Sequence, residues 1–231
     1  MSDHWLHRRD GPGQASCEVL ASRRACGQTY PNGLPSNVVT TAEPAQFREA
    51  VAAMNATIVR PEIELGPIRP PQRLAPFSYA LGAEVKHAET PIIPERSEGD
   101  AFGRLILLHD PEGAEAWDGT MRLVAYIQAD LDSSEAVDPL LPEVAWSWLV
   151  DALEQRAEHV TALGGTVTAT TSVRYGDISG PPRAHQLELR ASWTATTLEL
   201  GPHVEAFCEV LEHAAGLPPD GVTDLNSRNR A

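Results

Sequence analysis

Asp130, Asp132 and Glu135 lie in the most acidic stretch of the sequence, residues 130–138, between an expected strand and an expected helix. Their carboxylate oxygens are the ligands that Mg²⁺ and Ca²⁺ prefer. The spacing departs from that of a calcium-binding loop, because position six is Glu135 where such a loop needs glycine, and position twelve is Leu141. Acidic residues also gather at helix starts, where the helix dipole favours them. Two interpretations therefore stay open, a hard-cation site and the acidic start of a helix, and the second is favoured.

Two arginines accompany a polar segment between two expected strands. Arg96 stands within this segment and Arg104 follows it. A guanidinium group can hold a carboxylate through two parallel hydrogen bonds. That carboxylate could belong to a ligand, or to Glu98 or Asp100 in the same segment. Internal pairing is the default interpretation, and an anion-binding site is the alternative.

A third arginine interrupts the apolar stripe of an expected helix. At about 100° per residue, Arg156 falls about 20° from Leu149, in the middle of the stripe, with Trp148 at its flank. Burying a charge without a partner costs several kcal/mol. Arg156 is therefore expected to form a structural ion pair or to extend its head group to water. The alternative is a groove between helix and sheet that accepts an acidic or C-terminal ligand.

The sequence lacks the catalytic motifs that would identify a reaction. It contains no phosphate loop ending in Gly-Lys-Ser or Gly-Lys-Thr, no Gly-x-Gly-x-x-Gly after an expected strand, no His-Glu-x-x-His and no Gly-x-Ser-x-Gly. His203, Cys208 and His213 share one expected helix, but they point in different directions and cannot converge on one metal ion. We expect no cofactor, and the sequence favours a protein that is not an enzyme.

Composition restricts the classes of partner. The 231 residues carry 18 basic and 32 acidic side chains, a formal net charge of −14. This charge repels phosphates and anionic lipids, so neither nucleic acid nor a membrane is an expected partner. The three cysteines, Cys17, Cys26 and Cys208, do not form a disulfide framework, and no signal peptide is evident at the start. We expect a soluble protein of the reducing cytoplasm.

The chain is expected to have three regions. Residues 1–40 are punctuated by glycine and proline without a sustained period, which predicts a disordered extension and leaves open whether it is translated. Residues 41–218 should form one domain. Residues 219–231 are polar and should form a loose tail.

Periodicity in the central region predicts the fold class. Apolar and polar residues alternate, as in half-buried strands, over 77–85, 121–129, 167–175 and 187–195, and 105–108 is apolar on both faces. Helical spacing predicts three helices, over 44–58, 142–163 and 202–214. The order is helix, three strands, helix, two strands, helix. It predicts a two-layer α+β fold, with an antiparallel sheet of about five strands and three helices mainly on one face. The proline-rich residues 60–76 are expected to be extended and unpaired.

Several continuous blocks carry a family resemblance. The sequence over 69–76, 78–85, 98–105, 117–119 and 128–148 resembles an actinobacterial family of proteins of unknown function, the one numbered three thousand. The resemblance covers residues 43–217 and implies no activity, cofactor or catalytic residue. The order of elements alone is also similar to that of the secretion-chaperone-like fold, whose members bind partner polypeptides.

These observations favour an acidic, non-catalytic binding or adaptor protein that engages another polypeptide, through its helical layer or an exposed strand edge. The alternative is a small metal-dependent enzyme or regulator. It would use Asp130, Asp132 and Glu135, with Arg96 or Arg104 as the anion partner. The oligomeric state does not follow from the sequence.

Overall fold

The computed structural model describes residues 42–85, 101–157, 159–177 and 183–219. The expected extension, Arg96 and most of the expected tail lie outside the described residues. Six strands, three α-helices and one 3₁₀-helix follow one another in the described part: α1 (Ala45–Asn55), β1 (Ile63–Pro67), β2 (Phe77–Val85), β3 (Ala101–Ala114), η1 (Glu115–Trp117), β4 (Gly119–Leu131), α2 (Leu141–Arg156), β5 (Val160–Val173), β6 (Arg183–Ala195) and α3 (Gly201–Ala214). None of these helices is long and apolar enough to cross a bilayer.

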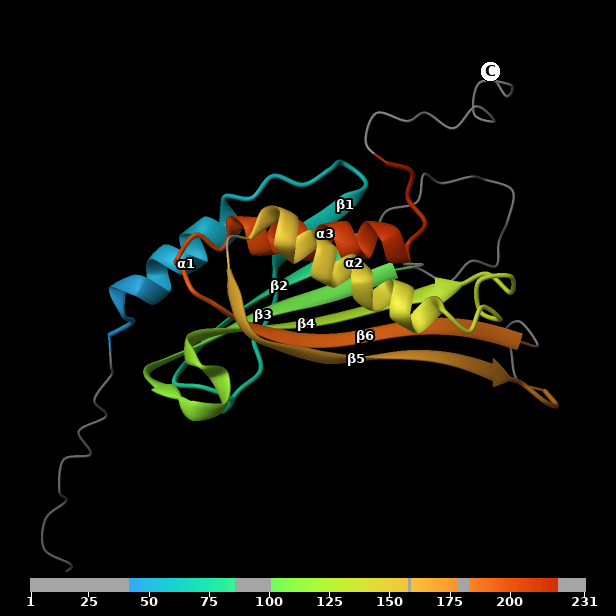
Figure 1. Cartoon of the computed structure of the whole chain (residues 1–231), viewed down its shortest axis with the longest axis horizontal. Helices are drawn as coiled ribbons and strands as arrows, with labels where there is room; N and C mark the ends of the chain where they lie inside the picture. The colour runs from blue at the N-terminus through green and yellow to red at the C-terminus, as the bar shows by residue number, and fades with distance from the viewer. Residues whose placement is uncertain (1–41, 86–100, 158, 178–182, 220–231) are drawn as a thin grey trace, which may run out of the picture. The chain divides into compact units, whose positions relative to one another are not determined.

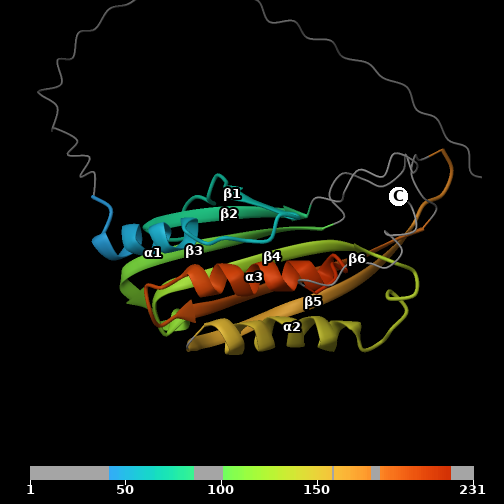
Figure 2. The same cartoon turned by 90° about the horizontal axis from the view of Figure 1, so that it is seen from above.

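The strands form one sheet in the order β1-β2-β3-β4-β6-β5, and every neighbouring pair is antiparallel. Figures 1 and 2 show the three helices on the same side of the sheet, with α3 between α1 and α2. The predicted α+β fold class, with an antiparallel sheet covered on one face, is confirmed. We call the face opposite the helices the open face.

Alternation along β4 shows how the two faces arise. Met121, Leu123 and Ile127 are buried beneath the helices, whereas Arg122 and Tyr126 between them are only partly buried on the open face. Successive side chains of a strand point to opposite faces, so a period of two in the sequence becomes an apolar face and a more polar one.

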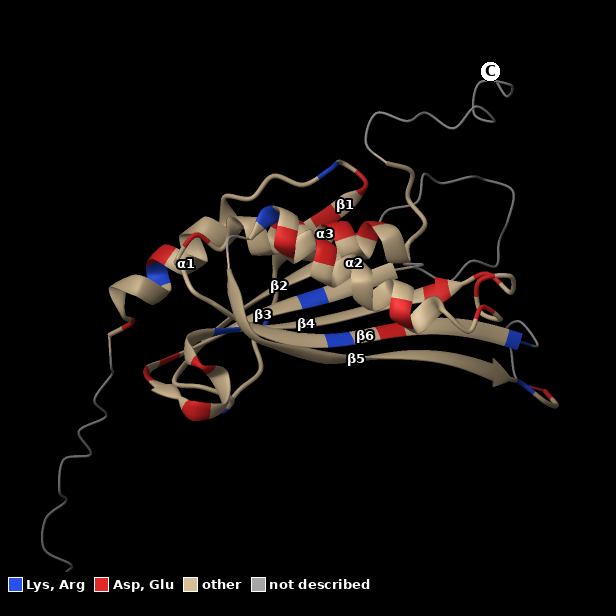
Figure 3. Ribbon diagram, in the orientation of Figure 1, with Lys and Arg blue, Asp and Glu red and all other residues tan. Residues whose placement is uncertain are grey.

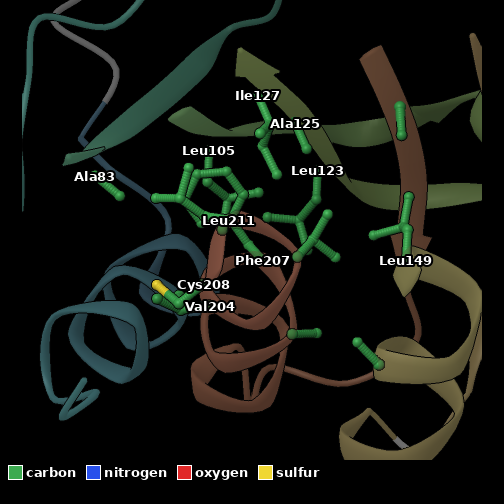
Figure 4. Packing of buried hydrophobic residues seen from close by; sticks show 14 of the residues in the cluster. Ala83, Leu105, Leu123, Ala125, Ile127, Leu149, Val204, Phe207, Cys208 and Leu211 are labelled. Carbon is green, nitrogen blue, oxygen red and sulfur yellow. The ribbon is translucent and has the colours of Figure 1, made fainter. Parts of the chain in front are cut away.

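Helix α3 supplies the centre of the core. Phe207 and Leu211 are fully buried, and Figure 4 shows their side chains among those of Leu105 and Leu123 from the sheet. Burying one such side chain contributes about 1.5–3 kcal/mol. The stretch from Leu200 to Ala214 is therefore fixed over the middle strands, and α1 and α2 pack beside it.

The second predicted helix ends earlier than expected. It was expected over 142–163, but α2 stops at Arg156 and β5 begins at Val160. Val160 and Leu163 continue the helical stripe, yet both are strand residues: Val160 pairs with Ala195 of β6, and Leu163 lies in the bulge between Thr161 and Gly164. Gly165 lies within β5, where an added Cβ would stand 2.8 Å from Cζ3 of Trp146. Gly165 therefore lets α2 pack closely on the sheet, and the pair Gly164-Gly165 does not end the helix.

The proline-rich segment contains a sixth strand, which the expectation of an unpaired segment missed. β1 pairs with β2 from Ile63 to Pro67. Pro61 precedes this strand and Pro67 ends it, so the residues between them keep the backbone N–H groups that a ladder needs. The result is a short edge strand beside β2.

Candidate functional site

A pocket of about 740 Å³ opens beside β1, which we call the open-face pocket. Its volume lies within the range of ligand-binding sites. The residues that line it come from β1, the segment after β1, β2 and β3; they include Glu64, Gly66, Ile68, Arg69, Pro71, Ala80, Gly82, Glu84, Phe102, Arg104 and Ile106.

The floor of the pocket depends on one rung of the sheet, a row of residues that lie opposite one another on neighbouring strands. Gly66 is opposite Gly82, and Gly82 is opposite Arg104. A Cβ on Gly82 would stand 2.8 Å from Cγ2 of Ile68, so only glycine leaves room for Ile68 to lie there. A Cβ on Gly66 would meet nothing within 4 Å. Gly66 therefore leaves open space at the sheet edge, whereas the room that Gly82 leaves is filled by Ile68.

The prolines form one wall of the pocket. Beyond β1 the backbone N–H of Ile68 donates to the carbonyl of Ala80 over 2.9 Å, and Ser78 Oγ donates to the carbonyl of Pro71 over 3.3 Å. Proline restricts the backbone to extended conformations and removes donors. The segment 67–71 is thus held against β2 by only a few hydrogen bonds, and it delimits the hollow.

Arg104 brings a guanidinium group to this pocket. Its side chain is exposed and forms no ion pair or hydrogen bond with any residue in the described ranges. Its possible internal partners Glu98 and Asp100 lie outside these ranges. Arg190, two strands away, differs: its Nε is 2.9 Å from Oε1 of Glu188. Within the described ranges, the donors of Arg104 are therefore not used by another residue.

Tyr126 separates the two arginines on the open face. It is opposite Arg104 on β3 and opposite Arg190 on β6. Its Oη donates to Gln128 at 2.7 Å or to Glu188 at 3.0 Å, and the guanidinium carbon of Arg190 lies 5.5 Å from its ring centre. Burial, followed by the hydrogen bond to Glu188, raises the pKa of Tyr126. The phenol is therefore neutral at pH 7 and acts as a hydrogen-bonding and packing group.

A further arginine on this face was not singled out by the sequence. Arg122 donates to the carbonyl of Ala162 over 2.8 Å, to Ser192 Oγ over 2.7 Å and to Thr194 Oγ1 over 3.2 Å. All three acceptors are neutral, and burial lowers the pKa of Arg122. Ala162 lies in the bulge between β5 and β6 and has a positive φ of 49°. Arg122 thus fixes the bulge at the far edge of the sheet.

The family of the chain follows from comparison with known proteins. A family model described as "Protein of unknown function (DUF3000)" matches residues 43–223. The chain belongs to the DUF3000 family. The expected resemblance is confirmed, and the match contains every described helix and strand, including the pocket. No curated protein and no solved structure matches the chain.

In this DUF3000 domain the predicted binding residues Arg156 and Trp148 are engaged inside the helical layer. Arg156 pairs with Glu205 of α3, N to O 3.2 Å, and also with Glu209. Trp148 stacks on His213, with ring centres 5.5 Å apart. Both contacts join α2 to α3. The guanidinium group of Arg156 therefore meets two carboxylates of the chain itself.

The acidic residues of the DUF3000 domain take part in local turns. Glu135 accepts a hydrogen bond from the backbone N–H of Asp132 over 3.2 Å, and Asp130 accepts one from Gln186 over 3.4 Å. Asp138 accepts the backbone N–H of Leu140, next to the start of α2. Among the described residues no three His, Cys, Asp or Glu side chains come close enough together to hold a metal ion. The structure does not bring Asp130, Asp132 and Glu135 to one point.

Cys208 and His203 lie within the core. Cys208 is buried, and burial raises the pKa of its thiol to about 12, which keeps it protonated. His203 is buried too, and its Nδ1 accepts the indole N–H of Trp193 over 3.1 Å. Neither group reaches the open-face pocket. The pocket therefore offers binding groups: the guanidinium groups of Arg69 and Arg104 and the carboxylates of Glu64 and Glu84, beside apolar side chains.

Proposed function

We propose that the DUF3000 domain is a non-catalytic binding protein that holds a segment of another polypeptide in the open-face pocket, where Arg104 receives a carboxylate of that segment. The observation that carries this proposal is the guanidinium group of Arg104, which forms no ion pair or hydrogen bond with a described residue, beside apolar side chains. A ligand with both an acidic and an apolar group matches this lining. An acidic side chain between apolar residues of a polypeptide supplies both.

The energetic contribution of Arg104 follows from its surroundings. A hydrogen bond to a charged group contributes about 1.5–3 kcal/mol, and a two-bond arginine–carboxylate pair lies at the stronger end. Ile68 and Ile106 would cover apolar groups of the segment on the same face as the acidic group, which adds about 25 cal/mol for each Å² removed from water. The two terms together are enough for specific recognition of a short segment.

Charge favours a polypeptide over a nucleic acid as the partner. The formal net charge is −14, and Figure 3 shows Asp and Glu along α2, α3 and the segment before α2. A polyphosphate chain would meet repulsion over a Debye length of about 8 Å from many of these groups. A polypeptide segment needs only one negative group, which Arg104 faces directly. We place this activity in the cytoplasm, because the three cysteines predict no disulfide framework.

Selection of peptides tests the proposal. A random library of displayed twelve-residue peptides is selected against the full-length protein, and the enriched peptides are titrated into the parent and into Arg104→Gln. Enriched peptides should carry an acidic residue beside apolar residues and should bind Arg104→Gln at least about tenfold more weakly. Arg48→Gln is the matched control, because Arg48 is an exposed arginine of α1 in the helical layer.

Two results would refute the proposed function. The first is failure to enrich any peptide on a protein that circular dichroism shows to be folded. The second is a set of enriched peptides that bind the parent, Arg104→Gln and Arg48→Gln equally. Retention of an oligonucleotide at 0.15 M salt, in place of peptide binding, would also refute it.

A further inference from the structure

The short strand β1 separates two pockets. The open-face pocket lies on one side of it, and a second pocket of about 510 Å³, which we call the helix-side pocket, lies on the other. The helix-side pocket is lined by Met54 and Asn55 of α1, by Thr57 and Val59 of the segment after α1, and by the strand residues Ile63, Leu65 and Leu81. Glu64, Gly66 and Pro67 line both pockets. Both pockets therefore open at the edge of the sheet.

The chemistry of the two pockets differs. The helix-side pocket combines apolar side chains, such as that of Leu65, with the polar groups of Asn55 and Thr57. Its rim is fixed, because Tyr79 Oη donates to Asn55 Oδ1 over 2.6 Å and so ties β2 to the last residue of α1. The open-face pocket has apolar residues together with the guanidinium groups of Arg69 and Arg104 and the carboxylates of Glu64 and Glu84. One side thus suits an apolar side chain, and the other suits an acidic one.

β1 is positioned to pair with a further strand. In the described part of the chain it pairs only with β2, at the end of the strand order. An extended segment laid along its outer edge would direct successive side chains to opposite faces of the sheet. Those side chains would enter the open-face pocket and the helix-side pocket in turn. Main-chain bonds to an edge strand, with alternate side chains in pockets, are a known mode of peptide recognition.

We propose that the bound segment adds to β1 as a further strand of the sheet, with an acidic side chain in the open-face pocket and its two apolar neighbours in the helix-side pocket. This inference rests on the proposed function and specifies how the partner is held. The partner motif is an acidic residue flanked on both sides by apolar residues, in an extended conformation.

The distance between Arg104 and the added strand selects the acidic residue. Arg104 lies on β3, so three strand spacings, about 14 Å, separate it from a strand added to β1. Gly82 and Gly66 on the intervening strands carry no side chain on this rung. Ile68 lies over Gly82, so the two side chains would meet beside Ile68. Extended arginine and glutamate side chains are long enough to do so, whereas aspartate is one methylene shorter. Peptides with glutamate should therefore bind more tightly than the same peptides with aspartate.

Methylation of single peptide nitrogens tests strand addition without altering the protein. Each backbone nitrogen of an enriched peptide is methylated in turn, and the Kd for the full-length protein is measured by fluorescence anisotropy. In an added strand, alternate N–H groups point to β1 and the others point to solvent. Methylation should weaken binding at least tenfold at every second position over the central residues, and little at the positions between.

A protein variant tests the place of binding. Gly66→Val adds a β-branched side chain at a position where an added Cβ meets nothing within 4 Å, so the fold should be kept. The new side chain would fill the space between Arg104 and the edge of the sheet. Gly164→Val on β5 is the matched control, since an added Cβ there also meets nothing within 4 Å. Gly66→Val should weaken peptide binding at least tenfold, and Gly164→Val should leave it unchanged.

The outcomes separate this inference from the proposed function. Binding that depends on Arg104 but is insensitive to nitrogen methylation at every position would keep the proposed function and refute strand addition. Binding that is independent of Arg104 would refute the proposed function itself. A protein that is dimeric in sedimentation and that loses its dimer in Gly66→Val would refute the inference, because a second copy would then occupy the β1 edge.

Discussion

Phe207 of α3 rests directly on Gly103 of β3: a Cβ added to Gly103 would stand 2.6 Å from Cζ of the ring. Gly103→Ala should therefore push α3 away from the sheet. The free energy of unfolding should fall by about 1–2 kcal/mol, a net value that includes the smaller gain from a stiffer unfolded chain. In a domain of this size, this cost lowers the melting temperature by roughly 2–8 °C. Gly164→Ala, with open space around the new Cβ, should change it little. Equal melting temperatures for both variants would contradict the close packing.

Acid should weaken the fold through His203. Burial lowers the pKa of His203 from 6.5 to about 4, so the neutral ring that accepts the Trp193 N–H persists in the folded state. Between pH 6.5 and pH 4 the unfolded chain binds more protons than the folded one, so the free energy of unfolding falls as the pH falls. The contribution is complete above pH 6.5, and about 3 kcal/mol is lost by pH 4.

Urea unfolding of His203→Gln at several pH values measures this contribution. Glutamine can accept the indole N–H but does not titrate, so the variant should lose less stability than the parent between pH 6.5 and 4. The exposed His159 gives the control variant His159→Gln, which should follow the parent. A pH dependence of His203→Gln as steep as that of the parent would contradict the assignment.

The ion pairs of Arg156 should contribute modestly to stability. The side chain of Arg156 is 40% exposed, and those of Glu205 and Glu209 are 44% and 23% exposed, so solvent screens the pairs. Arg156→Met should change the free energy of unfolding by less than about 1 kcal/mol, and it should leave the Kd of the selected peptides unchanged. A tenfold loss of peptide affinity would instead place the binding site in the helical layer.

Divalent cations should not stabilise the domain. Asp132 and Glu135 are joined by a local hydrogen bond, and Asp130 is bonded to Gln186, so the three carboxylates do not face one point. A site with a Kd of 10 µM would add about 2.7 kcal/mol at 1 mM ligand. The melting temperature should therefore shift by less than about 1 °C with 1 mM Mg²⁺ or Ca²⁺. A larger rise, abolished by Asp132→Ala, would support the metal-dependent alternative.

Local patterns predict the strands and helices where each element has one buried face. The alternation from Met121 to Ala129 predicts β4 because every second residue lies beneath the helices. The helical spacing predicts the wrong end for α2, between Arg156 and Val160. The apolar residues of α2 and those of β5 fall on one continuous helical stripe in the sequence, although the two sets belong to different elements. The end of α2 depends on tertiary packing, which the helical pattern does not contain.

The candidate site is less accessible to sequence reasoning than the fold. Arg104 can be singled out from its residue type and its place after a polar segment. The pocket itself depends on Gly66 and Gly82 meeting Arg104 on one rung, and this register joins three strands. Ile68 then covers Gly82 from a segment whose prolines predict only an extended backbone. No local sequence pattern predicts which residues that are distant in the sequence become neighbours in the fold.

A double-mutant cycle tests most directly whether Arg104 binds a carboxylate of a partner polypeptide. An enriched peptide and its variant with the acidic residue replaced by the matching amide are titrated by fluorescence anisotropy into the parent and into Arg104→Gln. The account predicts a coupling energy of about 1.5–3 kcal/mol between Arg104 and the acidic residue. A coupling energy of zero, with both single changes additive, would contradict it.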